Sequence, residues 1–163
     1  YDTDSEAKRL MESSLEVVQK LSECFGRDIY HNGRLNRGLL SSRVFGKSDK
    51  IVLLNSIVHP VVRFDFYRWS ESLNEEICFV ESAILYESRF DELVDEVWTV
   101  TAPEELRISR VRQRSGLTEE EIKKRMAAQL SEEEKQRRAA HIIWNDGNVS
   151  VIHRVLSLLK SLE

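Results

Sequence analysis

The stretch Val97-Trp-Thr-Val-Thr-Ala-Pro-Glu-Glu-Leu106 decides the fold class, because an apolar run changes there into a helix start. Val97, Trp98 and Val100 form a run that is typical of a buried strand in a parallel sheet, although periodicity alone also permits a buried helix. Pro103 followed by two glutamates is typical of a first helical turn, where proline loses no hydrogen bond and carboxylates face the positive end of the helix dipole. The stretch therefore predicts a strand that leads directly into a helix.

The same alternation extends along the chain in both directions. Short apolar runs lie at 77–80 and 83–86 before this stretch, and at 141–144 after it. Thr118 and Ser131 each precede a glutamate by three residues, which is the signature of a capped helix start. A turn at 145–148 leads into a final amphipathic helix, whose predicted inward positions are Val151, Ile152, Val155, Leu158, Leu159 and Leu162. Strands that alternate with helices predict an α/β fold with a parallel sheet.

The first part of the chain is predicted to be mainly helical. Asp4 suits the N-cap of a first helix, and a second helix ends at Gly26. A turn at 30–33 precedes two helices that Asn36 and Ser48 are expected to cap. Pro60 lies inside the second of these, so a kink or a break is expected near position 59. The second helix is predicted from the helical spacing of Leu15, Val18, Leu21 and Phe25. We interpret residues 12–75 as a helical insertion into the α/β domain.

Composition excludes several classes of protein. The 163 residues carry 24 basic and 28 acidic side chains, a net charge of −4, whereas a generic nucleic-acid binder would have a strong basic excess. No apolar run approaches the roughly 20 residues that span a bilayer. The two cysteines, Cys24 and Cys78, are expected to be reduced and packed, because they resemble neither a disulfide framework nor a zinc site. We expect a cytosolic, soluble, globular domain without a nucleic-acid or membrane partner.

Two acidic residues at the start of the chain are the first candidates for chemistry. Asp2 and Asp4 flank Thr3 at what looks like the carboxyl end of a strand, the edge at which open α/β sheets bind ligands. A carboxylate there can accept a proton from a substrate hydroxyl or support a metal ion that holds phosphates. The alternative is that Asp4 is only a helix cap.

Basic residues in the second half form a second group of candidates. Arg107, Arg110 and Arg114 share one face of the predicted helix, and guanidinium groups bind phosphate or stack on a base. Lys135 lies in a highly charged pair of helices that suits a mobile flap over an anionic ligand. For the arginines, a solvated cationic face is the commoner case, and a surface hairpin explains the charged helix pair equally well. The other basic residues of the flap are Arg125, Arg137 and Arg138.

His59, Glu81 and Glu87 are weaker candidates. His59 stands beside the predicted kink, where a histidine is more often structural than a ligand. The two glutamates bracket an apolar stretch and need solvent, a partner or a ligand. No nucleophilic triad and no metal-ligand cluster is evident, and the sequence contains no G-x-x-x-x-G-K-[ST] motif.

Several segments taken together resemble the dephospho-CoA kinase family of P-loop kinases. Each match is weak, but the set is specific and runs in order over nearly the whole chain. The matching segments are 1–11, Asn36-Arg37 with Leu40 and Val44-Phe45, Leu54-Asn-Ser-Ile-Val-His-Pro60, Glu81-Ser-Ala-Ile-Leu-Tyr-Glu87, Arg107 to Arg114, Gln129 to Lys135, and Asn145-Asp-Gly147.

The resemblance implies one kinase-like domain over 1–163, with a three-layer parallel sheet, an acceptor-binding insertion at 12–75 and a lid at 115–139. It implies transfer of the γ-phosphoryl group of ATP to the ribose 3′-hydroxyl of dephospho-CoA, the last step of coenzyme A synthesis, with Mg²⁺. The roles carried over by position are Asp4 as proton acceptor with Asp2 close by; Arg110, Arg114 and Lys135 near ATP; Asn145 near the adenine; and His59 and Glu81 toward the acceptor. The family's P-loop would lie before Tyr1, so we expect that a segment upstream is missing from this sequence.

Two other functions stay open. A kinase relative that binds the coenzyme A precursor without catalysis would retain the acceptor pocket. Another small-molecule kinase, such as a nucleoside monophosphate kinase, would share the fold and the lid.

Overall fold

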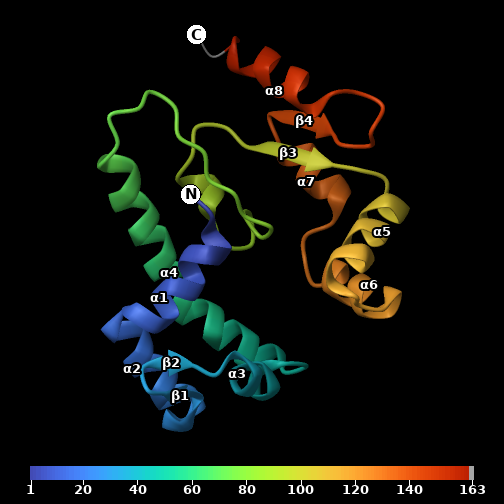
Figure 1. The fold of residues 1–163 in the computed structure, drawn as a ribbon. Coiled ribbons are helices and arrows are strands. Elements are labelled where there is room, and N and C mark those ends of the chain that lie inside the picture. The colour runs from blue at the N-terminus through green and yellow to red at the C-terminus, as the bar shows by residue number, and fades with distance from the viewer. Residues whose placement is uncertain (162–163) are drawn as a thin grey trace. The chain divides into compact units, whose positions relative to one another are not determined.

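The computed structural model describes residues 1–161, which divide into two compact units, 1–88 and 89 onward. The ribbon in Figure 1 shows the elements of each unit. Helices and a parallel strand pair confirm the α/β class that the sequence predicts.

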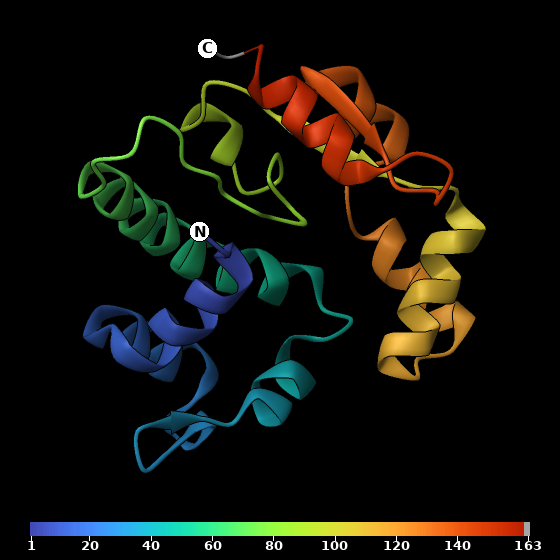
Figure 2. The same cartoon turned by 45° about the horizontal axis from the view of Figure 1, so that its top comes forward.

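The first unit is built from helices. These are α1 (Thr3–Ser13), α2 (Leu15–Phe25), α3 (Arg37–Val44) and α4 (Ser48–Glu71), with a short turn η1 (Arg27–Ile29). Helix α1 lies against α4 in both views (Figure 1, Figure 2). One apolar cluster fills this unit, and its buried members are Val17, Leu21, Phe25, Ile29, Leu35, Leu40, Val44 and Ile57.

Local signals in this unit act largely as predicted. Gly26 ends α2 with φ 95°, and the Asn36 side chain accepts from the Leu39 N–H to cap α3. The predicted turn is a tight hairpin between β1 (Tyr30–His31) and β2 (Arg34–Leu35). Its two central residues, Asn32 and Gly33, both have positive φ, which asparagine and glycine tolerate best.

Helix α4 departs from the predicted cap and is not interrupted at Pro60. Lys47, not Ser48, precedes the helix, and its side chain makes no capping bond. The helix then continues through Pro60 for 24 residues without the break that the sequence suggested. Proline removes one backbone donor, but buried neighbours such as Ile57 and Val62 hold the helix on the core on both sides of it.

The run at 77–80 is extended but is not the buried strand that was predicted. Its end pairs with the start of the chain in a short parallel ladder: Tyr1 N donates to Phe79 O, Glu81 N to Tyr1 O, and Thr3 N to Glu81 O. Ile77 and Phe79 are about half exposed.

The run at 83–86 forms turns instead of continuing as a strand. Ser88 donates its N–H and its hydroxyl to the Ile84 carbonyl, at 2.9 and 2.7 Å. Serine side chains close such local turns in competition with a strand ladder. Tyr86 is nevertheless buried, as its apolar neighbourhood suggested.

The second unit contains the parallel pair that the opening stretch predicts. Strand β3 (Trp98–Thr101) pairs with β4 (His141–Trp144), Trp98 opposite His141 and Thr101 opposite Trp144. The connection holds three helices, α5 (Glu104–Ser115), α6 (Glu119–Ala127) and α7 (Glu132–Arg138), and α8 (Val151–Leu159) follows β4. A short turn η2 (Phe90–Glu92) precedes β3.

The helix boundaries of this unit confirm the capping predictions. Thr118 and Glu121 form a complete capping box, and the Ser131 hydroxyl accepts from the Glu134 N–H. In α8 the predicted inward face is partly wrong, because Ile152 is 70% exposed. The prediction for Leu162 lies outside the described residues.

Both cysteines are free, as predicted, but Cys24 and Cys78 are exposed and not packed. Cys24 lies on the solvent side of α2, whose buried positions are Val17, Leu21 and Phe25. Cys78 lies in the exposed 77–80 run. Among the described residues, no helix is both long and apolar enough to cross a bilayer.

Candidate functional site

The N-terminus of α1 is capped by Asp2 and not by Asp4, which corrects the sequence prediction. Asp2 Oδ1 accepts the backbone N–H groups of Asp4 and Ser5 at 3.0 and 3.1 Å, and Oδ2 accepts the Ser5 hydroxyl at 2.6 Å. Asp2 takes this position because its backbone is still extended by pairing with Glu81, whereas Thr3 already begins the helix. Asp4 therefore lies in the first helical turn.

The two aspartates differ in their hydrogen bonding. The Ser5 hydroxyl, the Ser5 N–H and then the Asp4 N–H lower the pKa of Asp2, because they stabilise the carboxylate. The Asp4 carboxylate is exposed, and within residues 1–161 it makes no hydrogen bond or ion pair. Of the two, Asp4 has the carboxylate that is available to a ligand.

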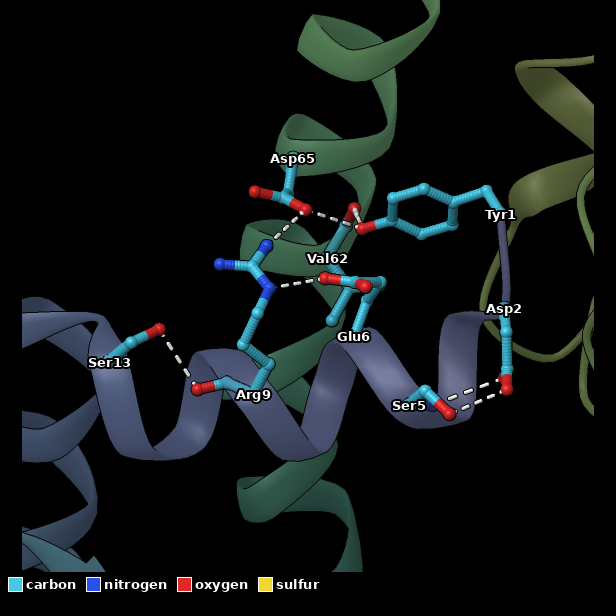
Figure 3. A network of polar contacts seen from close by, with 8 residues as sticks. All are labelled: Tyr1, Asp2, Ser5, Glu6, Arg9, Ser13, Val62 and Asp65. Atoms are coloured by element: carbon cyan, nitrogen blue, oxygen red, sulfur yellow. Dashed lines mark hydrogen bonds and ion pairs between the residues drawn. The ribbon is translucent and has the colours of Figure 1, made fainter.

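A polar network fixes the start of α1 on α4 (Figure 3). Asp65 Oδ2 accepts the Tyr1 hydroxyl at 2.7 Å and Arg9 Nη2 at 2.8 Å. Arg9 also pairs with Glu6 on its own helix. Burial, followed by the hydrogen bond to the Asp65 carboxylate, raises the pKa of the Tyr1 phenol, so this group stays a donor at neutral pH.

Glu81 lies beside the aspartates through its backbone. It pairs with Asp2 across the parallel bridge, and its carbonyl also accepts the Thr3 hydroxyl at 2.9 Å. Its side chain is exposed. The structure thus brings three predicted site residues together at one edge of the first unit: Asp2, Asp4 and Glu81.

His59 belongs to the same unit but is not joined to that edge. It is half-buried on α4, and burial, followed by the nearby Arg63 guanidinium, lowers its pKa. Arg63 in turn donates to the Ser88 carbonyl at 3.4 Å. Within the described residues, no hydrogen bond or ion pair links His59 to Asp2 or Asp4.

In the second unit, Arg110 and Asn145 meet at the carboxyl ends of the strands. Arg110 Nη1 donates to the Asn145 carbonyl at 2.7 Å, and the Asn145 N–H donates to the Thr101 carbonyl at 2.7 Å. Arg114 lies one turn further along α5, where it is exposed and makes no polar contact within residues 1–161. Arg110 and Asn145, both predicted to approach ATP, are therefore in contact, and Arg114 shares helix α5 with Arg110.

Lys135 lies on α7, which forms hydrogen bonds to β3, to α5 and to the segment that precedes it. Lys135 Nζ donates to Gln129 Oε1 at 3.1 Å, and its carbonyl accepts the Thr99 hydroxyl at 3.5 Å. At the start of α7, Glu132 accepts Arg107 Nη1 at 2.8 Å, and Arg107 Nε also donates to the Ala102 carbonyl. Arg107 thus ties α7 to α5 and to the end of β3.

The sequence analysis did not predict that Tyr1, Arg9 and Asp65 form one hydrogen-bonded network. The only available signal was Asp65 itself, a charged residue between Phe64 and Phe66 in an otherwise apolar helical pattern. Its partners lie 56 and 64 positions away, so the pattern did not reveal them.

The described residues contain no group of three or more His, Cys, Asp or Glu side chains that could hold a metal ion. A Mg²⁺ ion that arrives with a nucleotide does not need such a group, because phosphate oxygens and water supply most of its ligands. At the start of α1, the exposed Asp4 carboxylate is the one available for a remaining position.

Comparison with known proteins identifies similar chains over almost the full length. A family model described as dephospho-CoA kinase matches residues 1–150. A dephospho-CoA kinase of Porphyromonas gingivalis is 35% identical over 163 residues, which cover 99% of this chain and 81% of that protein.

Two solved structures have a similar fold. A Thermus thermophilus protein superposes with a TM-score of 0.83 at 32% identity, covering 98% of this chain and 82% of the other. A dephospho-CoA kinase from Campylobacter jejuni gives a TM-score of 0.69 at 24% identity, with coverage of 99% and 85%. At that identity the second likeness concerns the fold alone.

Proposed function

Because the chain belongs to the dephospho-CoA kinase family, we propose that it transfers the γ-phosphoryl group of ATP to the ribose 3′-hydroxyl of dephospho-CoA. The single observation that carries this proposal is the family match over residues 1–150, which includes the Asp2–Asp4 edge and the Arg110–Asn145 contact. Phosphoryl transfer depends mainly on positioning and on neutralising charge, and both units offer groups for these tasks.

Asp4 is the proton acceptor in this proposal. Its carboxylate is exposed and uncommitted, whereas three hydrogen bonds occupy Asp2. A base must be within hydrogen-bond reach of the hydroxyl that it deprotonates, and only a carboxylate without an internal partner offers both oxygens for this. Asp2 then serves the reaction by fixing the helical turn that carries Asp4.

Arg110, Arg114 and Lys135 bind the phosphates of ATP, and Asn145 contacts the adenine. Arginine matches phosphate with its planar fork of donors, and Arg114 presents an exposed, unpaired guanidinium within the described chain. Arg110 holds the Asn145 carbonyl, which leaves the Asn145 side-chain amide to meet a base. Mg²⁺, when bound with ATP, would neutralise part of the phosphate charge, and the exposed Asp4 carboxylate is the group at this edge that is available to it.

His59 and the helices of the 12–75 segment bind the acceptor, and Glu81 borders it beside Asp2. Residues 115–139 form the lid in this proposal. The free thiols Cys24 and Cys78 support a reducing, cytoplasmic location.

The direct test uses the protein expressed from its complete gene. Purified protein with Mg²⁺, ATP and dephospho-CoA is expected to form coenzyme A and ADP in equal amounts. Nucleoside monophosphates serve as control acceptors. Calorimetric binding of dephospho-CoA without any ATP-dependent turnover would contradict the enzyme and support a non-catalytic binder instead.

A further inference from the structure

We infer that Asp65 is a positioning residue for phosphoryl transfer, because it holds the start of α1, and with it the Asp4 carboxylate, in one orientation on α4 (Figure 3). The inference rests on the proposed function, since it assigns a role within that reaction. Asp65 itself does not touch the reacting groups. It acts through Tyr1 and Arg9.

One carboxylate oxygen joins two donors that lie on either side of Asp4 in the chain. Asp65 Oδ2 accepts the hydroxyl of Tyr1, which precedes the Asp2 cap, and Nη2 of Arg9, which lies more than one turn beyond Asp4. Rotating α1 about its axis, or sliding it along α4, would have to lengthen at least one of these bonds. The pair of contacts therefore restricts both movements.

The rest of the Tyr1 side chain is fixed by packing. Its ring meets Phe66 edge-on and Trp69 at a tilt, with ring centroids 5.3 Å apart in both cases. The hydroxyl is thus presented to Asp65 by aromatic contacts that do not depend on the hydrogen bond. Removal of the hydroxyl alone should leave the packing in place and release only the polar contact.

A second restraint acts on the same segment. Thr3 donates its N–H and its hydroxyl to the Glu81 carbonyl, at 3.1 and 2.9 Å. Residues 1–4 are therefore held by α4 and by the 79–81 segment, and neither set of contacts uses the Asp4 carboxylate. A supported backbone with a free carboxylate is what a positioned base requires.

The charge of Asp65 can be removed without unfolding α1. Arg9 retains Glu6 as a partner on its own helix, and Asp2 continues to cap the helix start. An asparagine at position 65 still offers an oxygen to Tyr1, but it loses the ion pair that connects the two helices. The expected consequence is a loosened orientation of an otherwise intact helix.

The test compares Asp65→Asn, Tyr1→Phe and the double variant in the protein expressed from its complete gene. We expect each single change to lower kcat by about 10- to 100-fold, because small misplacements of a reacting group have effects of this size. The KM for dephospho-CoA should move by less than about twofold, because an interaction that matters only in the transition state alters kcat. The double variant should be about as slow as the slower single variant, because both changes break one network.

Asp65→Glu and Asp95→Asn are the matched comparisons. Glutamate keeps a carboxylate within reach of both donors and should recover most of the activity. Asp95 is an exposed aspartate that makes no polar contact within residues 1–161, so its neutralisation should leave kcat unchanged. Thermal unfolding of every variant shows that each is assayed well below its melting temperature.

An unchanged kcat in both single variants would overturn the inference. A fall in kcat/KM that comes entirely from a higher KM for dephospho-CoA would overturn it as well. If Asp65→Asn fails to fold, Tyr1→Phe decides the question alone, because it removes one hydroxyl group and no packing. A wild-type protein that makes no coenzyme A would overturn the proposed function itself and this inference with it. An active wild type with unaffected variants would overturn the inference only.

Discussion

Asp2 and Asp4 are two residues apart, yet the structure gives their carboxylates different tasks. Both carboxylate oxygens of Asp2 accept hydrogen bonds from the first turn of α1, while the Asp4 carboxylate remains exposed. The difference arises because the backbone at Asp2 is still extended and the helix begins at Thr3. A side chain at the N-cap accepts hydrogen bonds from the free N–H groups of the first turn, which is the position that Asp2 and not Asp4 occupies.

Replacement of Asp4 by Asn should lower kcat by about 10²–10⁴-fold if Asp4 accepts the hydroxyl proton, because the amide cannot take it. Thermal stability should change little, because the carboxylate makes no internal bond within the described chain. Steady-state kinetics of coenzyme A formation measure this, with Asp95→Asn as the control. A rate equal to that of the wild type would leave Asp4 without a catalytic role.

Replacement of Asp2 by Ala should lower the melting temperature at neutral pH, because three hydrogen bonds to the carboxylate are lost. The folded-state pKa of Asp2 lies below its ordinary value, so its stabilising effect is present above the unfolded pKa of about 3.9. The effect is lost as the pH falls through the folded pKa. The melting temperatures of the two proteins should therefore differ at pH 7, and the difference should shrink as the pH falls below about 3.9. A constant difference would contradict the prediction.

At the scale of elements, α7 belongs with β3 and α5 more firmly than a lid helix would suggest. Glu132 at its start pairs with Arg107, and Gln136 near its end donates to the Thr101 hydroxyl at 3.4 Å. Helix α6, by contrast, packs against α5. If a lid moves, these contacts favour α6 and its flanking turns as the moving part, with Lys135 held in place.

Replacement of Arg107 by Ala should test this attachment. It removes a partly buried ion pair and the bond to the Ala102 carbonyl, and we expect the free energy of unfolding to fall by about 1–3 kcal/mol. The KM for ATP should rise as well, because Lys135 on α7 would lose its fixed position. Denaturant unfolding and steady-state kinetics measure the two effects.

Gln113→Ala on the exposed side of α5 is the control for Arg107→Ala, because its side chain makes no polar contact within residues 1–161. A stable Arg107→Ala variant with an unchanged KM for ATP would show that α7 does not need this tie.

At the scale of the whole molecule, the proposed sites for the two substrates fall in different compact units. Asp4, Glu81 and His59 belong to residues 1–88, while Arg110 and Asn145 belong to the second unit. Each unit has its own interior, the first around Leu21 and the second around Ile143 and Phe90. This division predicts that each ligand, bound alone, stabilises mainly the unit that contains its proposed site.

Hydrogen exchange read by mass spectrometry should reveal this division. Dephospho-CoA alone should slow exchange mainly in peptides from residues 1–88, and a non-hydrolysable ATP analogue mainly in peptides from 89 onward, because each ligand stabilises the segments that it contacts. If dephospho-CoA and the ATP analogue slow exchange in the same peptides, the assignment of the two sites to different units is wrong.

Features that depend on a few neighbouring residues were correctly predicted from the sequence. The capping box at Thr118, the cap at Asn36 and the terminator at Gly26 each need only a short segment and one or two side chains. The parallel pair of β3 and β4 also followed from the alternation of apolar runs and helix starts. The family resemblance has the same origin, since it depends on short segments in a fixed order.

The sequence by itself determined the α/β class, most helix ends and the identity of the candidate residues. Tertiary structure alone decided which of the two aspartates caps α1, which apolar runs become strands and which side chains hold α1 on α4. The physical reason is distance along the chain: a cap is settled by the next three residues, whereas Asp65 finds its partners 56 and 64 positions away, and no local pattern encodes a contact that only folding creates.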